Sequence, residues 1–189
     1  MPAEIRELEE HEMPEPMLLT KEERQKTRTL YQTVFLEDSQ KFVDFYYEYK
    51  IRDNQIYALW EDEQYVSMVH LNPYTMIVNG YEVLSNYIVA VATLKNYRHR
   101  GYMRLLLETA LRQMAADKMP FTFLMPASES IYTPFDFVWI SPFTELPKRV
   151  THLDADGQNR YLASRYQLFC KRDARYMENL KAEHLAEVG

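Results

Sequence analysis

The chain has 189 residues, enough for one domain or one domain with an appendage. With 47% hydrophobic and 14% aromatic residues, the composition excludes a disordered chain. The net charge of −6 argues against a general nucleic-acid-binding protein and is compatible with a cationic substrate. The single cysteine, Cys170, excludes an internal disulfide, and no apolar run approaches the ~18 residues that span a bilayer. We therefore expect a cytoplasmic protein that binds no nucleic acid and no membrane.

The amino-terminal part is predicted to be a leader followed by two helices. Residues 1–16 are acidic and interrupted by prolines, without the basic start and apolar block of a signal peptide, and we expect a flexible leader. A helix is predicted over residues 21–35, where Thr20 and Glu23 have the spacing of a capping box. A second helix is predicted over residues 39–49. Its aromatic run, FVDFYYEYK, favours core packing, with Tyr46 or Tyr47 facing an acceptor site as the alternative.

The pattern then changes to strands. Strands are predicted over residues 55–61 and 65–71, with Pro73 ending or bending the second. The segment YTMIV-NG-YEVL predicts a hairpin, because Asn-Gly accepts the positive φ angles of a type I′ turn. Residues 86–93 predict a strand covered on both faces, because five consecutive residues are apolar.

The remaining chain predicts one long helix and several shorter elements. Apolar residues from Met103 to Met114 recur at helical spacing, and Pro120 ends the helical pattern. Further strands are predicted at FTFLMPA (121–127), FVWI and YLASRYQLFCK, with a helical turn capped by Ser128 between the first two. The spacing over residues 173–188 is helical. We expect an α+β fold with a domain at residues 17–172 and a carboxyl-terminal helix or linker at 173–189.

A basic turn at LKNYRHRGYMR joins a predicted strand to the long helix. Unpaired backbone N–H groups and the helix dipole make such a helix start an anion site. Gly101 lets the backbone approach an anion closely, and Arg98 and Arg100 suit phosphate oxygens. Neither a Walker pattern nor a Gly-x-Gly-x-x-Gly turn is present, so we expect a pyrophosphate that is held in a different way.

The segment YRHRGYMRLLLETAL resembles the acyl-CoA pyrophosphate loop of the GCN5-related N-acetyltransferases, the GNAT superfamily, whose pattern is Gln/Arg-x-x-Gly-x-Gly/Ala. Arg98 and Gly101 fit this pattern, whereas Met103 stands where a small residue is usual. The segment FLMPASESIYTPFDF resembles the Eis-like (enhanced intracellular survival) branch, with Asp136 where glycine is common. The resemblance implies the GNAT fold, a mostly antiparallel central sheet with helices on both faces, in an amino-terminal acetyltransferase domain.

The resemblance also implies an activity and a set of site residues. The activity is direct transfer of the acetyl group of acetyl-CoA, a cosubstrate, to a primary amine of a small molecule or protein. Tyr132 is the implied general acid, and backbone groups of Val91 and Thr93 are implied to bind the pantetheine arm. The amides of the loop are implied to bind the pyrophosphate, which gives the cofactor-binding set Val91, Thr93, Arg98, His99, Arg100, Gly101, Tyr102 and Met103.

The chemistry is consistent with these roles. A tyrosine, with an ordinary pKa of ~10, can protonate the leaving thiolate. A lysine-like acceptor amine costs roughly 4–5 kcal/mol to deprotonate at pH 7, so a base is needed, and Glu82 and Glu129 are candidates. Scattered histidines predict no metal site, and Cys170 is expected in the core. The alternative function is a non-catalytic acyl-CoA sensor or assembly domain of GNAT fold, and a homo-oligomer is compatible with either function.

Overall fold

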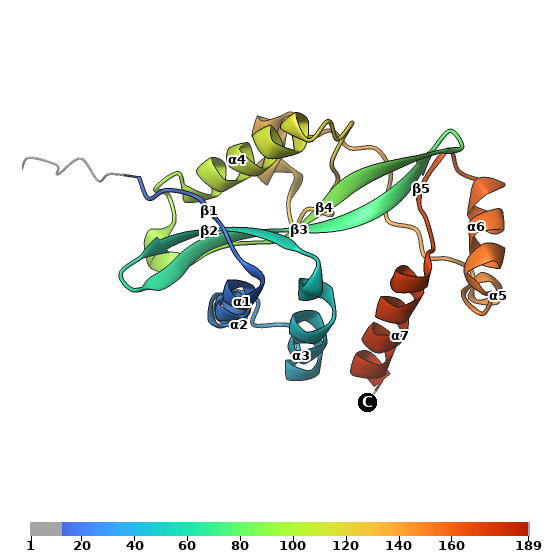
Figure 1. Ribbon diagram of the computed structural model, residues 1–189, viewed down its shortest axis with the longest axis horizontal. Coiled ribbons are helices and arrows are strands. Elements are labelled where there is room, and N and C mark those ends of the chain that lie inside the picture. Colours follow the sequence, from blue (N-terminus) through green and yellow to red (C-terminus); the bar gives the residue numbers. More distant parts are fainter. Residues whose placement is uncertain (1–12, 189) are drawn as a thin grey trace, which may run out of the picture.

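The computed structural model describes residues 13–188, so most of the predicted leader, residues 1–12, lies outside the described part. The described residues form a five-stranded sheet in the order β1-β2-β3-β4, with β5 paired to the far end of β3 (Figure 1). All of these pairings are antiparallel. The strands are β1 (Met17–Leu18), β2 (Gln55–Glu61), β3 (Gln64–Val78), β4 (Tyr81–Thr93) and β5 (Leu168–Cys170).

Helices cover both faces of the sheet, as expected. Figure 1 shows α4 above the sheet and α1, α2 and α3 below it, with α5 and α6 beyond the tip of the β3–β4 hairpin. The α-helices are α1 (Lys21–Arg24), α2 (Arg28–Val34), α3 (Gln40–Glu48), α4 (Tyr102–Ala116), α5 (Lys148–Thr151), α6 (Ala155–Ala163) and α7 (Ala174–Val188). Short 3-10 turns are η1 (Gln25–Thr27), η2 (Lys50–Arg52), η3 (Lys95–Tyr97), η4 (Glu129–Ile131) and η5 (Thr133–Phe135). Among residues 13–188, no helix is long and apolar enough to cross a membrane.

Two buried clusters lie on opposite faces of the sheet, because alternate strand residues point to opposite sides. On the α3 face, Tyr46 and Tyr47 are only 3% and 2% exposed, so the prediction that the aromatic run packs in the core is confirmed. On the α4 face, Leu106 and Leu107 of the helix pack against buried residues of β3 and β4. Each fully buried leucine contributes about 1.5–3 kcal/mol to folding.

A buried polar chain crosses the α3 face. Asn54 Nδ2 donates to Tyr46 Oη (3.1 Å), and Tyr46 Oη lies 3.0 Å from His70 Nδ1. Burial lowers the pKa of His70 to about 3, so the ring is neutral at pH 7, and its tautomer decides whether Nδ1 accepts from or donates to the Tyr46 hydroxyl. His70 Nε2 then faces Met68 Sδ at 3.3 Å. These hydrogen-bonded side chains fix Asn54 relative to the middle of β3.

Local turn signals are confirmed. Thr20 and Glu23 form the predicted capping box at the start of α1. Asn79 and Gly80 have φ angles of 50° and 85°, as a type I′ turn requires, and they join β3 to β4.

The prediction that Pro73 ends a strand is wrong, because β3 runs through it, and the alternative that it bends the strand stays a prediction. Pro73 stands opposite Asn86 of β4, and Asn86 directs its carbonyl away from β3, to the amide of Phe123. The nitrogen of Pro73 therefore points to the other side of β3. There β2 has already ended opposite Leu71 and β5 begins only opposite Met76. The missing N–H costs no ladder hydrogen bond at this edge position.

Of the three strand predictions after residue 120, two are wrong and the third is confirmed only for its last part. Of residues 121–127, only Phe123 pairs, in an isolated parallel bridge to Tyr87, and Pro126 lacks the N–H that would continue a ladder. The FVWI segment lies outside the named strands, with Val138 79% and Trp139 61% exposed. The first residues of YLASRYQLFCK end helix α6, because apolar residues there are spaced for a helix as well as for a strand, and only Leu168–Cys170 form a strand.

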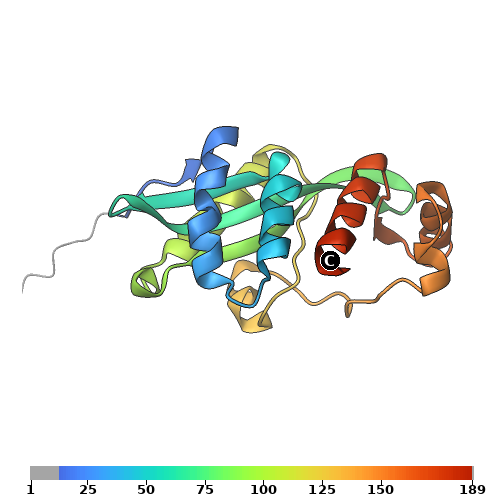
Figure 2. The same cartoon turned by 90° about the horizontal axis from the view of Figure 1, so that it is seen from below.

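The carboxyl-terminal helix packs on the rest of the chain. Helix α7 contacts α3, and Figure 2 shows α2, α3 and α7 side by side across one face of the sheet. The aromatic ring of Tyr176 on α7 lies 6.2 Å from that of Tyr74 on β3. The boundary of the domain at residue 172 stays a prediction, but the helix after it is in contact with the core.

Candidate active site

A bulge interrupts β4 near its end. His70 pairs with Val89 and Met68 with Ala92, so two residues of β4, Ala90 and Val91, stand opposite the single Val69 of β3. Ala90 has a φ of 49°, a left-handed conformation that is uncommon for a residue other than glycine. The strand changes direction at this point, as β-bulges make strands do.

The last residues of β4 turn their peptide groups toward an open edge. Leu94 N donates to Val66 O (2.9 Å), which makes Thr93 and Ser67 a non-hydrogen-bonded pair. The N–H and C=O of Thr93 therefore point away from β3, and strand alternation gives Val91 the same orientation. On that side, the last pairing of β4 within the described chain is the Tyr87–Phe123 bridge, with Ile88 N donating to Phe123 O (2.9 Å). Beyond it, β4 and the next segment separate.

The predicted basic loop joins this open edge to α4. The turn η3 is followed by His99 with a φ of 64° and Gly101 with a φ of 84°. Gly101 is the residue before the first turn of α4, and among the described residues no side chain caps that helix. The amides at the start of α4 therefore remain as donors for an anion. A Cβ added at Gly101 would lie 3.7 Å from Met13 Cε, so Met13 approaches the loop from the amino-terminal segment.

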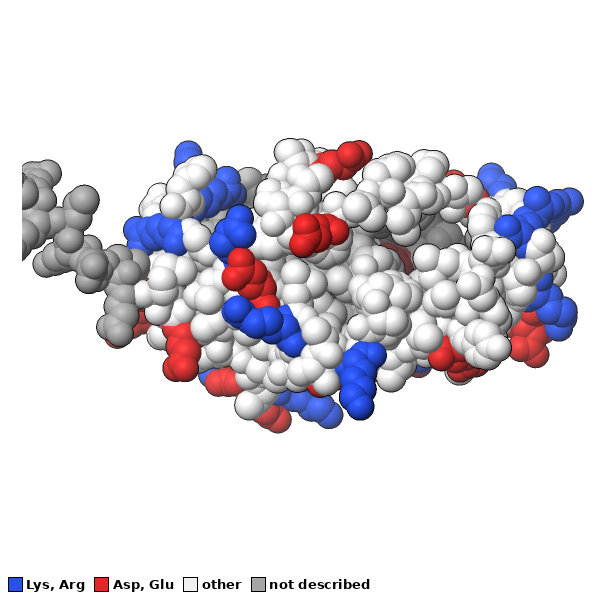
Figure 3. Space-filling model, turned by 90° about the horizontal axis from the view of Figure 1, so that it is seen from above, with Lys and Arg blue, Asp and Glu red and all other residues white. Residues whose placement is uncertain are grey.

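The arginines of the loop already contact the protein. Arg98 Nε donates to Thr93 O (3.2 Å), and Arg100 forms an ion pair with Glu61 (3.1 Å) and lies 4.8 Å above the Tyr97 ring. Figure 3 looks onto the α4 face and shows basic side chains gathered at its left part, with acidic side chains among them. Positive charge at this loop is therefore partly balanced by the protein's own carboxylates.

The other loop residues in the predicted cofactor-binding set differ in exposure. His99 is exposed, whereas Tyr102 is buried, with its hydroxyl donating to Glu61. Met103 is half-buried against the cluster on the α4 face. For Tyr102 and Met103, contact with an anion is therefore restricted to their backbone amides.

Tyr132 lies at the junction of η4 and η5, in the segment after the Phe123 bridge. It is half-buried against the α4-face cluster and makes an edge contact with the Phe137 ring at 5.9 Å. Burial, and secondarily the nearby Tyr87, raise the pKa of Tyr132 above its ordinary value. The hydroxyl is thus protonated at neutral pH, the state that a general acid needs. Ser128 precedes η4 but does not cap it; its hydroxyl contacts that of Ser130.

The two candidate bases lie in different places. Glu82 is at the hairpin end of β4, nine residues before Val91, and pairs with Lys171. At about 3.3 Å per residue, this is about 30 Å along the strand, which argues against Glu82 as the base. Glu129 is exposed, three residues before Tyr132. Cys170 is half-buried on β5, and burial raises its pKa to about 11, so it is no activated nucleophile.

Sequence reasoning missed two features of this region. One is the conformation of Ala90, since alanine gives no signal for a positive φ angle. The other is Glu61, at the end of β2, which holds both Arg100 and Tyr102. Within residues 13–188, no group of three or more His, Cys, Asp or Glu residues is placed to hold a metal ion.

Comparison with known proteins identifies the fold. Residues 15–140 match the family model described as "Acetyltransferase (GNAT) domain". A predicted acetyltransferase from Clostridium acetobutylicum, solved with acetyl-CoA, is 12% identical with a TM-score of 0.61, over 75% of this chain and 100% of that one. A GNAT family acetyltransferase from Brucella melitensis, in complex with acetyl-CoA, is 15% identical with a TM-score of 0.57, over 72% and 93%.

Some similar structures are much longer. A probable N-acyltransferase of unknown function from Enterococcus faecalis is 22% identical with a TM-score of 0.60, over 66% of this chain. The match spans only 32% of that chain, about a third of its length. No curated protein matches this sequence significantly.

Proposed function

Since the chain belongs to the GNAT acetyltransferase family, we propose that it binds acetyl-CoA and transfers the acetyl group directly to a primary amine. The observation that supports this proposal is that three features lie beside the same buried cluster on the α4 face. These are the bulge at Ala90 and Val91, the uncapped start of α4 at Gly101, and the half-buried Tyr132. We also propose membership of the Eis-like branch, in an amino-terminal domain, which the sequence around Tyr132 supports.

In this proposal, backbone groups bind the cofactor. The pantetheine arm pairs with the outward peptide groups of Val91 and Thr93, like an added strand. Arg98 then releases the Thr93 carbonyl, which it contacts in the structure. Amides from Arg98 to Met103 hold the pyrophosphate, helped by the dipole of α4. Because Gly101 has no Cβ, the phosphate oxygens approach the main chain closely.

The chemical step needs an oxyanion donor, an acid and a base. The amine attacks the thioester carbonyl, and a peptide N–H at the β4 bulge stabilises the charge that develops on its oxygen. The C–S bond breaks, and Tyr132 gives its proton to the leaving thiolate. Its raised pKa keeps the proton in place until the thiolate forms. The amine loses its proton to water or to Glu129.

The test is a thiol-release assay with acetyl-CoA and a panel of amines. Tyr132→Phe is expected to lower kcat by about 10²–10⁴-fold, because it removes the acid, while the dissociation constant of acetyl-CoA changes little. Tyr161→Phe, on α6 beside Arg165, is the matched control and leaves kcat unchanged. A Tyr132→Phe variant with full kcat would exclude this residue as the acid.

A non-catalytic acyl-CoA sensor is the second candidate. It is favoured by the position of Glu82, far along β4, and by the exposure of Glu129, which leave no buried carboxylate assigned as a base. Binding of acetyl-CoA without thiol release, over the whole amine panel, would support the sensor. A protein without either function would show no thermal shift, whereas ligand at ~100 times its dissociation constant stabilises by ~2.7 kcal/mol.

A further inference from the structure

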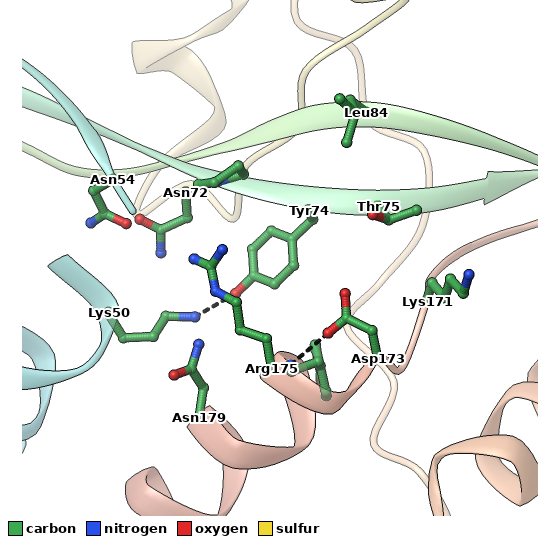
Figure 4. Close-up of a pocket in the computed structure, with 12 residues that line it drawn as sticks. Lys50, Asn54, Asn72, Tyr74, Thr75, Leu84, Lys171, Asp173, Arg175 and Asn179 are labelled. Atoms are coloured by element: carbon green, nitrogen blue, oxygen red, sulfur yellow. Dashed lines mark hydrogen bonds between the residues drawn. The ribbon is translucent and has the colours of Figure 1, made fainter. Parts of the chain in front are cut away.

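A polar pocket lies on the α3 face, between η2, the middle of β3 and helix α7. Its volume is about 130 Å³, and Figure 4 shows its lining. The residues that matter here are Lys50, Asn72, Tyr74, Arg175 and Asn179. The pocket contains no residue of the loop before α4. The pocket lies beside the part of β3 that pairs with neither β2 nor β5.

Nitrogen donors from three elements converge in this pocket. Figure 4 shows Lys50 and Asn179 pointing toward each other from η2 and α7, with Asn72 of β3 above them. Lys50 Nζ donates to Tyr74 Oη at 2.6 Å. An ammonium group has three N–H donors, so two are available for a ligand.

The pocket also contains a buried acceptor. Asn72 is 4% exposed, and its Oδ1 has no hydrogen-bond partner in the described part of the chain. A buried polar atom without a partner costs about 1–3 kcal/mol, and a ligand that donates to it recovers part of this cost. Asn54, the neighbouring carboxamide, is held by Tyr46 and is therefore fixed in place.

The cations of the pocket differ in their partners. Three cations and one carboxylate line the pocket. That carboxylate, Asp173, accepts a hydrogen bond from the backbone amide of Tyr176 at the start of α7. Lys171 pairs with Glu82 and Arg175 with Asp53, whereas Lys50 donates to the uncharged hydroxyl of Tyr74.

Burial lowers the pKa of Lys50, and its charged neighbours act in both directions. Glu183 and Cys170 raise this pKa, and Arg175 lowers it. An anion beside the ammonium group offsets the cost of its burial.

From this geometry we propose that the pocket binds a small carboxylate that also carries a hydroxyl or amino group. Its carboxylate accepts from Lys50 and Asn179, and its hydroxyl or amino group donates to Asn72 Oδ1. The volume of the pocket agrees with this class of ligand. A protein cavity of ~150 Å³ holds benzene, and lactate and alanine have as many non-hydrogen atoms as benzene, about six each. The binding does not depend on acetyl transfer, because no residue of the proposed acetyl-CoA site takes part.

The experiment is calorimetry on the full chain without acetyl-CoA, at pH 7, with lactate, alanine and inorganic phosphate as probes. Propane-1,2-diol, which replaces the lactate carboxylate with an alcohol, is the neutral control. We expect lactate or alanine to bind and the diol not to bind. Absence of binding by both carboxylates at millimolar concentration would overturn the proposal, as would binding of phosphate alone.

Variants assign the binding to the pocket. Lys50→Met keeps the length of the side chain and is expected to weaken carboxylate binding at least tenfold. Lys41→Met, an exposed lysine of α3 outside the pocket, is the matched control and leaves binding unchanged. If Lys50→Met does not fold, Asn179→Ala on α7 provides the second test, with a smaller loss. Unchanged binding in a folded Lys50→Met or Asn179→Ala protein would refute the assignment.

Discussion

The loop before α4 and the pocket between α3 and α7 both present nitrogen donors, but they are built differently. In the loop, Arg98 and Arg100 are held by Thr93 and Glu61, and the donors left over are main-chain amides at a helix start. In the pocket, the donors left over are the side chains of Lys50 and Asn179. One site therefore depends on backbone conformation and the other on the identity of side chains.

This difference predicts different sensitivities. A backbone site fails when a φ angle changes and tolerates loss of an exposed charge. A side-chain site fails when one polar group is removed and depends on the packing that holds it. The pocket is joined to the core by the chain from Asn54 through Tyr46 to His70, whereas the loop lies at the surface. Three experiments separate these two kinds of construction.

The largest expected effect is a loss of stability in acid. The pKa of His70 is about 3 in the folded protein, against ~6.5 for an unfolded chain. Between these values only the unfolded chain takes up the proton, so the free energy of unfolding falls as pH decreases below ~6.5 and is constant above it. The slope approaches ~1.4 kcal/mol per pH unit, or roughly 2 kcal/mol between pH 6.5 and 5.

Urea unfolding at pH 7 and pH 5 measures this effect. His70→Gln removes the titrating ring and is expected to flatten the pH dependence, although it lowers stability at pH 7. His99→Gln, in the exposed loop, is the control and keeps the wild-type slope. Parallel pH profiles for wild type and His70→Gln would show that other groups cause the acid sensitivity.

The second effect comes from the backbone of the loop. Gly101→Val places a branched side chain at a φ of 84°, where an L-residue costs about 1–2 kcal/mol, and we expect acetyl-CoA to bind roughly 5–30-fold more weakly. Gly80→Val is a matched control. Gly80 has a φ of 85° in the β3–β4 turn, and a Cβ there meets no atom within 4 Å. Both variants lose stability, but only Gly101→Val loses affinity, as titration with coenzyme A measures.

The same contrast explains what the sequence predicts. The Thr20–Glu23 cap, the Asn79-Gly80 turn and the apolar stripe of α4 are local patterns, and the structure confirms each of them. Pairing after residue 120 is not local. Residues around Phe123 have the composition of a strand, but strand formation depends on β4, which bends away after Ile88.

The candidate site was predictable to the same extent. Arg98 and Gly101 stand in one short segment, so the loop is visible in the sequence. The bulge depends on the register of two strands and has no sequence signal at Ala90. The α3–α7 pocket combines Lys50, Asn72 and Asn179, which lie more than 20 residues apart along the chain, so no motif contains it.

The smallest expected effect is that of Arg98→Ala. Arg98 is exposed, and its charge near the pyrophosphate is screened by water and salt. Its removal also frees the Thr93 carbonyl, which the pantetheine arm needs in the proposed complex. These effects oppose each other, so we expect the dissociation constant of acetyl-CoA to change less than about fivefold, or ~1 kcal/mol.

The matched control is Arg112→Ala. Arg112 is exposed on α4, and its substitution removes an equal charge farther from the loop. If Arg98→Ala and Arg112→Ala bind alike, the loop holds its anion through the main chain. A loss above tenfold in Arg98→Ala alone would mean that a side chain dominates there too. The loop and the pocket would then both bind their ligands through side chains. The weakened binding of Gly101→Val would reflect a displaced Arg98 rather than displaced amides.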